Sequence, residues 1–306
     1  MKKYAHAGAL AVVLAALLWS VDGLLRRNLY SLPPPVIVFW EHLLGLVFLV
    51  PFLWSTRSKF RELTRKQWWA MALVALLSGA LGTILYTAAL GQINYINFSV
   101  VVLLQQLNPI FAIVTAAVLL REKLSPRFLG LAALALLGAY LVSFPDMTVN
   151  LDTGKGTLVA ALYAAGAAAC WGVGTAFSKY ALKGTSYPHV TAARFGLTAV
   201  ISLFFVLGSG SAAAISELTQ TQFFYLLAIT FSTGLVALLI YYYGLQRVAA
   251  SRAAILELAW PLSAVIIGWL FLHQGLTPTQ ALGGLTLVGT TYIIARTSKE
   301  QMSSQG

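Results

Sequence analysis

The chain repeats several short patterns at one fixed spacing, and this repetition constrains its fold more than any local motif. Trp19 in LLWSVDG is matched by Trp171 in ACWGVGT, 152 positions later. The same interval separates two prolines and two turn sequences: Pro109 from Pro261, and Leu124-Ser125-Pro126 from Leu276-Thr277-Pro278. Three landmarks with a single offset are rare by chance in apolar sequence. We therefore expect two copies of one structural unit.

The composition excludes a water-soluble domain. The chain has 306 residues, of which 59% are hydrophobic and only 9% are charged. Soluble domains contain roughly 25% charged residues, so these few charges cannot cover a water-facing surface. The net charge of +11 does not indicate a nucleic-acid partner, because the Lys and Arg residues stand between apolar runs. The lone Cys170 excludes an internal disulfide and supplies no metal motif, and we expect no cofactor.

Ten segments are long and apolar enough to cross a bilayer, which takes about 20 residues each. Because the first segment carries landmarks that recur in the second half, we interpret it as a retained span and not as a signal peptide. The predicted spans run near 7–26, 34–54, 68–91, 97–119, 127–145, 157–179, 188–208, 223–244, 252–272 and 279–296.

Five spans fall in each half, and this odd number sets the relation between the halves. After five crossings the chain lies on the opposite side, so the second copy must enter the membrane from the other face. The sequence predicts an all-α integral membrane protein with ten transmembrane helices arranged as two inverted five-helix repeats. Its units are a first repeat over 1–145, a linker over 146–156, a second repeat over 157–298 and a tail over 299–306.

The distribution of Lys and Arg predicts the orientation of the chain. With the N-terminus inside, sixteen of these residues fall on the cytoplasmic side and three, Arg26, Arg27 and Lys155, fall on the outer side. Positive residues accumulate on the cytoplasmic side of membrane proteins. We therefore expect a multi-pass protein of the cytoplasmic (inner) membrane with both termini in the cytoplasm.

Glu257 is the strongest candidate for a functional group inside the membrane. It lies in the ninth span, where an ionisable side chain costs about 3 kcal/mol. Its repeat counterpart is Gln105, since each stands four positions before a matched proline that removes a helical hydrogen bond to its carbonyl. Asn108 shares a helix face with Gln105. We expect these three residues to border a substrate path; the alternative is a kinked helix whose polar groups satisfy one another.

Glu41 and Arg194 are a second pair of repeat counterparts, of opposite charge. Each stands six residues after a proline, Pro35 and Pro188 respectively. We interpret Arg194 as a structural charge, and we leave Glu41 open between a structural role and a role in coupling or gating. His42, beside Glu41, is a further coupling candidate because its side chain titrates near neutral pH.

Asp22 and the aromatic residues complete the candidate site. Asp22 precedes Arg26 by four positions, which predicts an ion pair on one helix face, with a gating role as the alternative. Of the consecutive tyrosines 241–243 at most two can face one cavity, because neighbouring helical residues point about 100° apart. The aromatic residues that we expect to line a cavity are Trp19, Trp171, Trp260, Tyr86 and Tyr242. The alternative for each ring is packing in the core or at the membrane interface.

The sequence also resembles a known family. LLREKLSPRFLGLAALALLGAYLV (119–142) is similar to the EamA-type signature of the drug/metabolite transporter superfamily, and WLFLHQGLTPTQALGGLTLVGTTYI (269–293) is a weaker second copy. The resemblance implies two inverted five-helix repeats around a central cavity. Glu41 stands where the family often has Arg, and Gln274 replaces the acidic residue that Glu122 supplies in the first copy. The change at Glu41 favours a cationic or zwitterionic substrate, or proton coupling.

These observations predict a secondary transporter and not an enzyme, since no Walker loop, metal-spaced His/Cys set, HExxH or GxSxG sequence is present. We expect it to move a small organic metabolite, such as an amino acid, an amine or a drug-like compound, by alternating access, with protons as a candidate coupling ion. Its expected partners are this substrate and the lipid bilayer, as a monomer or a homodimer. Two alternatives stay open: a flippase for lipids or lipid-linked carriers, and a membrane receptor without transport.

Overall fold

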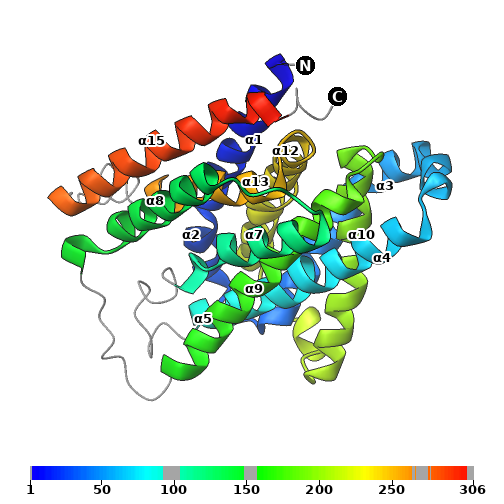
Figure 1. Cartoon of the computed structure of the whole chain (residues 1–306). Coiled ribbons are helices and arrows are strands. Elements are labelled where there is room, and N and C mark those ends of the chain that lie inside the picture. The colour runs from blue at the N-terminus through cyan, green and yellow to red at the C-terminus, as the bar shows by residue number, and fades with distance from the viewer. Residues whose placement is uncertain are drawn as a thin grey trace.

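The computed structural model describes residues 2–91, 104–147, 157–263, 266, 275 and 277–301, and every regular element within these ranges is helical (Figure 1). The first half contains α1 (Lys2–Trp19), α2 (Asp22–Arg26), α3 (Pro34–Ser55), α4 (Arg65–Val74), α5 (Gly82–Gly91), α7 (Asn108–Leu119) and α8 (Pro126–Ser143). The second half contains α9 (Thr157–Ala181), α10 (Tyr187–Gly208), α11 (Gln220–Ile229), α12 (Leu235–Leu245), α13 (Ala250–Leu256) and α15 (Pro278–Gln301). The predicted all-helical class is confirmed.

Seven helical stretches of the described chain are long and apolar enough to cross a membrane: His6–Leu29, Pro34–Ser55, Arg65–Gly91, Pro126–Ser143, Leu158–Ala181, Tyr187–Gly208 and Gln220–Leu245. The other three predicted spans, near 97–119, 252–272 and 279–296, contain α7, α13 and α15, and the first two extend outside the described residues. The protein is therefore a multi-pass membrane protein, and the count of ten spans stays a prediction.

Two of the long helices change their hydrogen-bonding pattern midway. α4 continues into α5 through a π-helical segment, η3 (Ala75–Leu81), and α11 continues into α12 through a second one, η6 (Thr230–Gly234). Both helices begin with the same capping box, at Thr64 and at Thr219, which are 155 positions apart. Because π-helical turns interrupt the regular i+4 ladder, they often stand at functional sites.

The contacts between the two halves are reciprocal. α1 packs against α12, and α9, the second-half counterpart of α1, packs against α4 and α5. α3 packs against its own counterpart α10, and α8 packs against its counterpart α15. Exchange of the two halves therefore maps one set of contacts onto the other, which is the pattern that a two-fold relation between two similar units produces.

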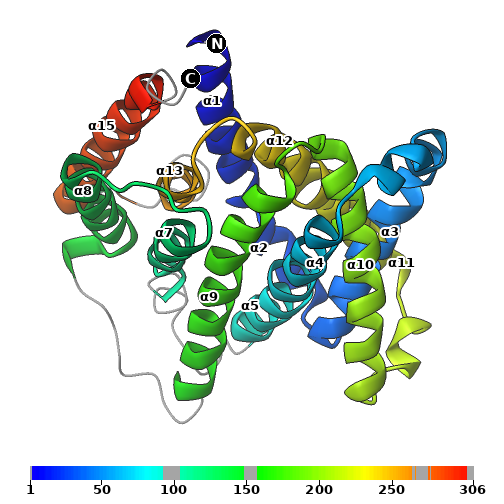
Figure 2. The ribbon, with the colours of Figure 1, turned by 45° about the vertical axis from the view of Figure 1, so that its right-hand side comes forward.

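Glycines let the paired helices approach each other closely. A Cβ atom added at Gly138 of α8 would lie 3.0 Å from the backbone oxygen of Gly283 on α15, and one added at Gly283 would lie 2.8 Å from the oxygen of Gly138. Figures 1 and 2 show these two helices side by side over most of their length. Small residues at such a crossing favour helix association in lipid, where packing replaces the hydrophobic effect.

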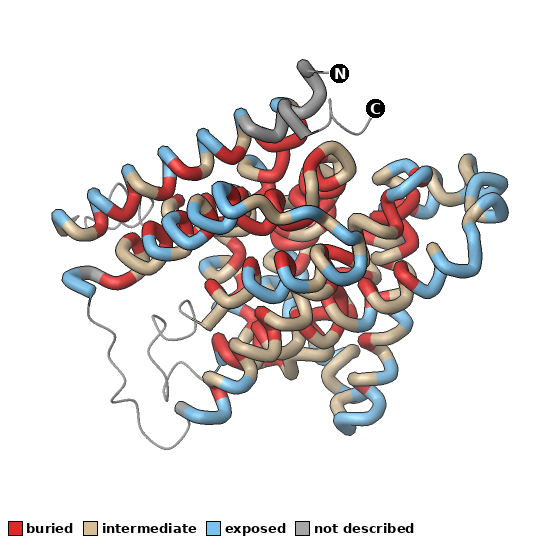
Figure 3. The backbone as a smooth tube through the Cα atoms, viewed as in Figure 1, coloured by how far each residue is buried: buried red, intermediate tan, exposed pale blue. Residues whose placement is uncertain are grey.

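The outward faces of the helices are apolar, as a lipid environment requires. Large hydrophobic side chains such as Phe48, Val118 and Leu158 are more than 60% exposed. Figure 3 shows buried and exposed positions alternating around the helices, with the buried faces turned toward the interior of the bundle. Polar and charged side chains are instead found among the buried residues, including Asp22, Arg26 and Glu41. The bundle is thus apolar outside and locally polar within.

Candidate substrate cavity

A cavity of about 220 Å³ lies between the two halves, with residues of α1, α2, α3, α5, α7, α9, α10, α12 and α13 on its walls. Both π-helical segments also reach it, through Ser78 and through Thr233 and Gly234. Eleven of the twelve predicted site residues line it: Glu257, Gln105, Asn108, Trp19, Trp171, Trp260, Tyr86, Glu41, Asp22, His42 and Arg194. The fold therefore brings residues that are far apart in the sequence to one internal space.

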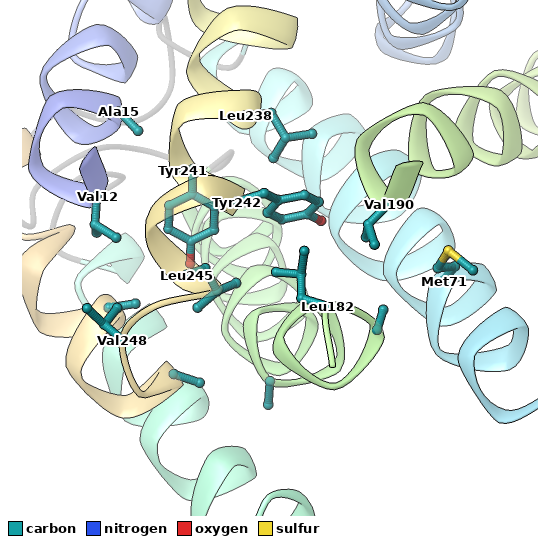
Figure 4. Packing of buried hydrophobic residues seen from close by; sticks show 14 of the residues in the cluster. Val12, Ala15, Met71, Leu182, Val190, Leu238, Tyr241, Tyr242, Leu245 and Val248 are labelled. Carbon is teal, nitrogen blue, oxygen red and sulfur yellow. The ribbon is translucent and has the colours of Figure 1, made fainter. Parts of the chain in front are cut away.

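Tyr242 does not line the cavity, which corrects the expectation from the sequence. Its ring is fully buried, and its hydroxyl lies 2.9 Å from both Ser178 Oγ and the Nη1 of Arg194, which donates to it. The neighbouring Tyr241 lines the cavity instead. Figure 4 shows the two rings leaving α12 in different directions. Consecutive helical residues diverge by about 100°, and the sequence does not show which of them faces inward.

Glu257 is held by uncharged groups. It caps the C-terminal end of α13, its Oε1 accepts a hydrogen bond of 2.5 Å from the Tyr241 hydroxyl, and Asn108 Nδ2 donates to its Oε2 over 3.4 Å. No Lys, Arg or His in the described part of the chain lies within ion-pair distance of this carboxyl group. A buried carboxyl group without a cationic partner is chemically suited to take up and release a proton.

Asp22 and Glu41 share one cation, Arg26. Arg26 is only 2% exposed, and its guanidinium donates to both carboxylates. Its Nε lies 2.8 Å from Asp22 Oδ2, and its Nη2 lies 3.1 Å from Glu41 Oε2. Thr233 of η6 adds a 2.7 Å hydrogen bond to Asp22 Oδ1. The predicted i,i+4 pair of Asp22 and Arg26 is present, and Glu41 extends it into a triad within the first half. The hydrogen bond from Thr233 links this triad to the second half.

Arg194 on α10 and His42 on α3 both line the cavity. Arg194 donates to the Tyr242 hydroxyl and, over 3.3 Å, to the backbone oxygen of Ser78, while its Nε has no hydrogen-bond partner among the described residues. Its partner is thus not its repeat counterpart Glu41, which pairs with Arg26. His42 Nδ1 lies 2.8 Å from the Val38 carbonyl oxygen, so this ring nitrogen is already engaged within α3.

Two tryptophan–tyrosine pairs cross between the halves. The ring of Trp19 lies 5.1 Å from that of Tyr241, and the ring of Trp171 lies 5.2 Å from that of Tyr86. Trp19 and Trp171 are separated by 152 positions, and Tyr86 and Tyr241 by 155, the spacing of the Thr capping boxes. Each pair therefore joins one residue of the first half to one of the second, and the two pairs are counterparts.

The two indole N–H groups make matching contacts with the π-helical segments. Trp19 Nε1 donates to the Thr233 carbonyl oxygen of η6 over 2.9 Å, and Trp171 Nε1 donates to the Ser78 carbonyl oxygen of η3 over 3.2 Å. Ser78 and Thr233 are again 155 positions apart. Each half thus presents an irregular helical carbonyl to the tryptophan of the other half, which orients both rings along the cavity wall.

Sequence reasoning missed the contact of Arg26 with Glu41, the place of Tyr241 on the cavity wall, and the π-helical carbonyls of Ser78 and Thr233. One available signal would have found Tyr241: Glu-Leu-Thr occurs at 62–64 and at 217–219, and this second offset of 155 aligns Tyr241 with Tyr86. The same offset pairs the two π-helical segments. The contact of Arg26 with Glu41 could not be predicted from an offset, because it depends on how closely α2 and α3 approach each other.

The EamA-like transporter family matches residues 6–144 and 158–296, so its pattern covers both halves separately. This chain belongs to that family. The riboflavin transporter ImpX of Fusobacterium nucleatum subsp. nucleatum is 34% identical over 92% of this chain and 95% of its own length. An uncharacterized inner membrane transporter, YicL of Salmonella typhimurium, is 26% identical over 96% of this chain and 97% of its own.

A solved crystal structure of 16% sequence identity superposes with a TM-score of 0.73 and covers 94% of this chain and 97% of that one. At this identity the likeness concerns the fold alone. The family match and the resemblance found in the sequence agree, so the protein is an EamA-family transporter that acts within a membrane on a small-molecule substrate.

Proposed function

We propose that the protein carries riboflavin, or a flavin of similar shape, across the cytoplasmic membrane. The observation that supports this most is the composition of the cavity wall, in which three tryptophans and two tyrosines stand beside three carboxamides. Flat aromatic ligands gain affinity from such rings, and a few placed polar groups fix their orientation. Riboflavin combines a flat tricyclic ring, a hydrogen-bonding edge and an uncharged polyol chain. A relative with 34% identity is named as a riboflavin transporter.

The transport cycle that we propose is alternating access between two inverted five-helix repeats, with ten spans and both termini in the cytoplasm. The reciprocal contacts of α1 with α12 and of α9 with α4 and α5 support this view, because the two halves can exchange roles. The Asp22–Arg26–Glu41 triad lies between α2, α3 and η6, and we assign it to closing one end of the cavity. Glu257 would carry the coupled proton.

An amino acid is the second candidate, and one observation favours it. Glu257 lacks a cationic partner and Arg194 lacks an anionic one within the described chain, although both line the same cavity. The ammonium group of a zwitterion would pair with Glu257 and its carboxylate with Arg194. An aromatic amino acid would also use the rings.

Transport by purified protein in proteoliposomes separates the two candidates. We expect saturable uptake of radiolabelled riboflavin that excess unlabelled riboflavin abolishes and that a mixture of the twenty amino acids leaves unchanged. If the vesicles take up an amino acid and no riboflavin, the amino acid becomes the substrate and the flavin proposal is wrong. Flux of neither compound, despite binding, would favour a receptor role.

Glu257→Gln tests the proton-coupling role in the same vesicles. Glutamine keeps the shape and the hydrogen-bond acceptor for Tyr241, but it cannot exchange a proton. We expect an imposed pH gradient to drive accumulation by the unmodified protein and not by the variant, while riboflavin counterflow survives in both. Gradient-driven accumulation by the variant would remove Glu257 from proton coupling.

A further inference from the structure

Two carboxamides with unused hydrogen-bonding atoms stand one turn apart on the cavity wall. Gln105 and Asn108 flank the break before α7, where Gln106 and Leu107 form a turn and Pro109 follows in the first turn of α7. Gln106 is anchored elsewhere, since its Nε2 donates to the Ala139 carbonyl and to Ser143 Oγ on α8. The break therefore leaves Gln105 and Asn108 as the two amides available to a ligand.

The unused atoms are one donor and one acceptor. Gln105 Nε2 and Asn108 Oδ1 are both buried and have no hydrogen-bond partner in the described part of the chain. The orientation of the Asn108 amide follows from its neighbour: Nδ2 faces the Glu257 carboxylate at 3.4 Å, so the oxygen must face away from it. Buried polar atoms are paired in the great majority of cases, so an unpaired donor and an unpaired acceptor three residues apart on one cavity wall indicate a missing ligand.

The pattern defines the ligand chemistry. A partner must present a carbonyl oxygen to Gln105 Nε2 and an adjacent N–H to Asn108 Oδ1. A cyclic imide such as the pyrimidinedione ring of a flavin carries both groups on one edge. The rest of that flat ring would then extend toward the tryptophan–tyrosine pairs that line the same cavity.

We propose that Gln105 and Asn108 form a specificity subsite that reads the pyrimidinedione edge of the substrate, with Asn108 accepting the ring N3–H. This inference rests on the proposed flavin substrate. It adds which atoms of the protein distinguish a flavin from another flat aromatic compound, and it assigns different roles to the two amides.

Equilibrium binding of riboflavin and of N3-methylriboflavin to the purified protein tests the subsite. The methyl group removes the N3–H and leaves the ring system and polyol intact. A site built around a hydrogen bond rejects an analogue that lacks it, so we expect the methylated compound to bind roughly 10- to 100-fold more weakly. In the Asn108→Leu variant, the affinity for riboflavin should fall by a similar factor. The affinities for the two compounds should then differ by less than about 3-fold.

Gln105→Leu separates the roles of the two amides. Because Gln105 faces a carbonyl that both compounds keep, this variant should bind both about 5- to 10-fold more weakly and retain the preference for riboflavin. Gln220→Leu removes an exposed carboxamide at the start of α11, outside the cavity, and should change neither affinity.

The outcomes are distinguishable. If the unmodified protein binds both compounds equally, the subsite is wrong while the flavin substrate stands. If it binds neither, the flavin proposal fails and the subsite fails with it. If Asn108→Leu weakens both compounds by one factor, or the preference survives in it, Asn108 is only structural. If the Asn108→Leu variant does not fold, the comparison of riboflavin with N3-methylriboflavin in the unmodified protein still tests whether the site requires the N3–H group.

Discussion

The buried triad of Asp22, Arg26 and Glu41 makes the sharpest prediction about stability. The three side chains are 11%, 3% and 8% exposed in that order, and the single guanidinium contacts both carboxylates at 2.8 and 3.1 Å. Arg26→Leu removes the cation that holds them together and leaves two buried carboxylates without it. Removing one partner of a buried ion pair costs about 3–5 kcal/mol, because the remaining charge is not compensated.

For a chain of 306 residues, such a loss corresponds to a decrease of the melting temperature by about 5–8 °C. We propose to measure it by thermal unfolding in detergent, followed by tryptophan fluorescence. Arg27→Leu is the matched control, since Arg27 is the exposed neighbour on the same segment and its replacement should change stability by about 0.5 kcal/mol or less.

A triple variant separates charge from packing. Arg26→Leu combined with Asp22→Asn and Glu41→Gln removes the unpaired charges together with the cation, so we expect most of the lost melting temperature to return. If Arg26→Leu is as mild as Arg27→Leu, the triad is not a buried ionic cluster in the membrane. If the triple variant is no more stable than the single one, the loss came from packing and the electrostatic reasoning is wrong.

Two further predictions concern the close contacts around the cavity. A Cβ atom at Gly172 would lie 2.5 Å from the Asn108 carbonyl oxygen. Gly172→Ala should therefore destabilise the protein by about 1–3 kcal/mol and weaken riboflavin binding. Gly130→Ala is the control and should not destabilise the protein, because no atom lies within 4 Å of a Cβ at Gly130. Trp19→Phe and Trp171→Phe each remove one N–H bond to a π-helical carbonyl, so each should cost about 1 kcal/mol in thermal unfolding. Clearly unequal losses from the two tryptophans would contradict their equivalence.

The long apolar segments predicted the helical class, and the repeat at 152 positions predicted part of the cavity wall, because matched prolines and tryptophans mark equivalent places in two similar units. Glu257, Gln105 and Trp171 all line the cavity for this reason. The choice between Tyr241 and Tyr242 depends on the rotation of α12, which shifts by about 100° for each residue. A uniformly apolar helix gives no pattern that fixes this rotation.

The second partner of Arg26, Glu41, could not be predicted from the sequence, for a different reason. Its i,i+4 contact with Asp22 is local and was predicted, but the contact with Glu41 requires α2 and α3 to approach each other across a turn. The positive-inside rule treats every Arg near a span end as a solvated charge. That assumption fails when a carboxylate on a neighbouring helix offers a better partner than water.

The charges on the cavity wall restrict what can cross with the substrate. Among the described residues of the wall, Asp22 and Glu41 are balanced in number by Arg26 and Arg194, which leaves Glu257 as the unmatched carboxyl group. Enclosing an unbalanced charge in a low-dielectric region is costly. The occluded state therefore forms most easily when the charges of the cavity wall and of the substrate add up to zero. An uncharged flavin achieves this only if Glu257 is protonated, whereas a monovalent cation achieves it with Glu257 ionised. The proton dependence of transport therefore reports the net charge of the substrate, and loss of that dependence in Glu257→Gln would be expected for a flavin but not for a cation.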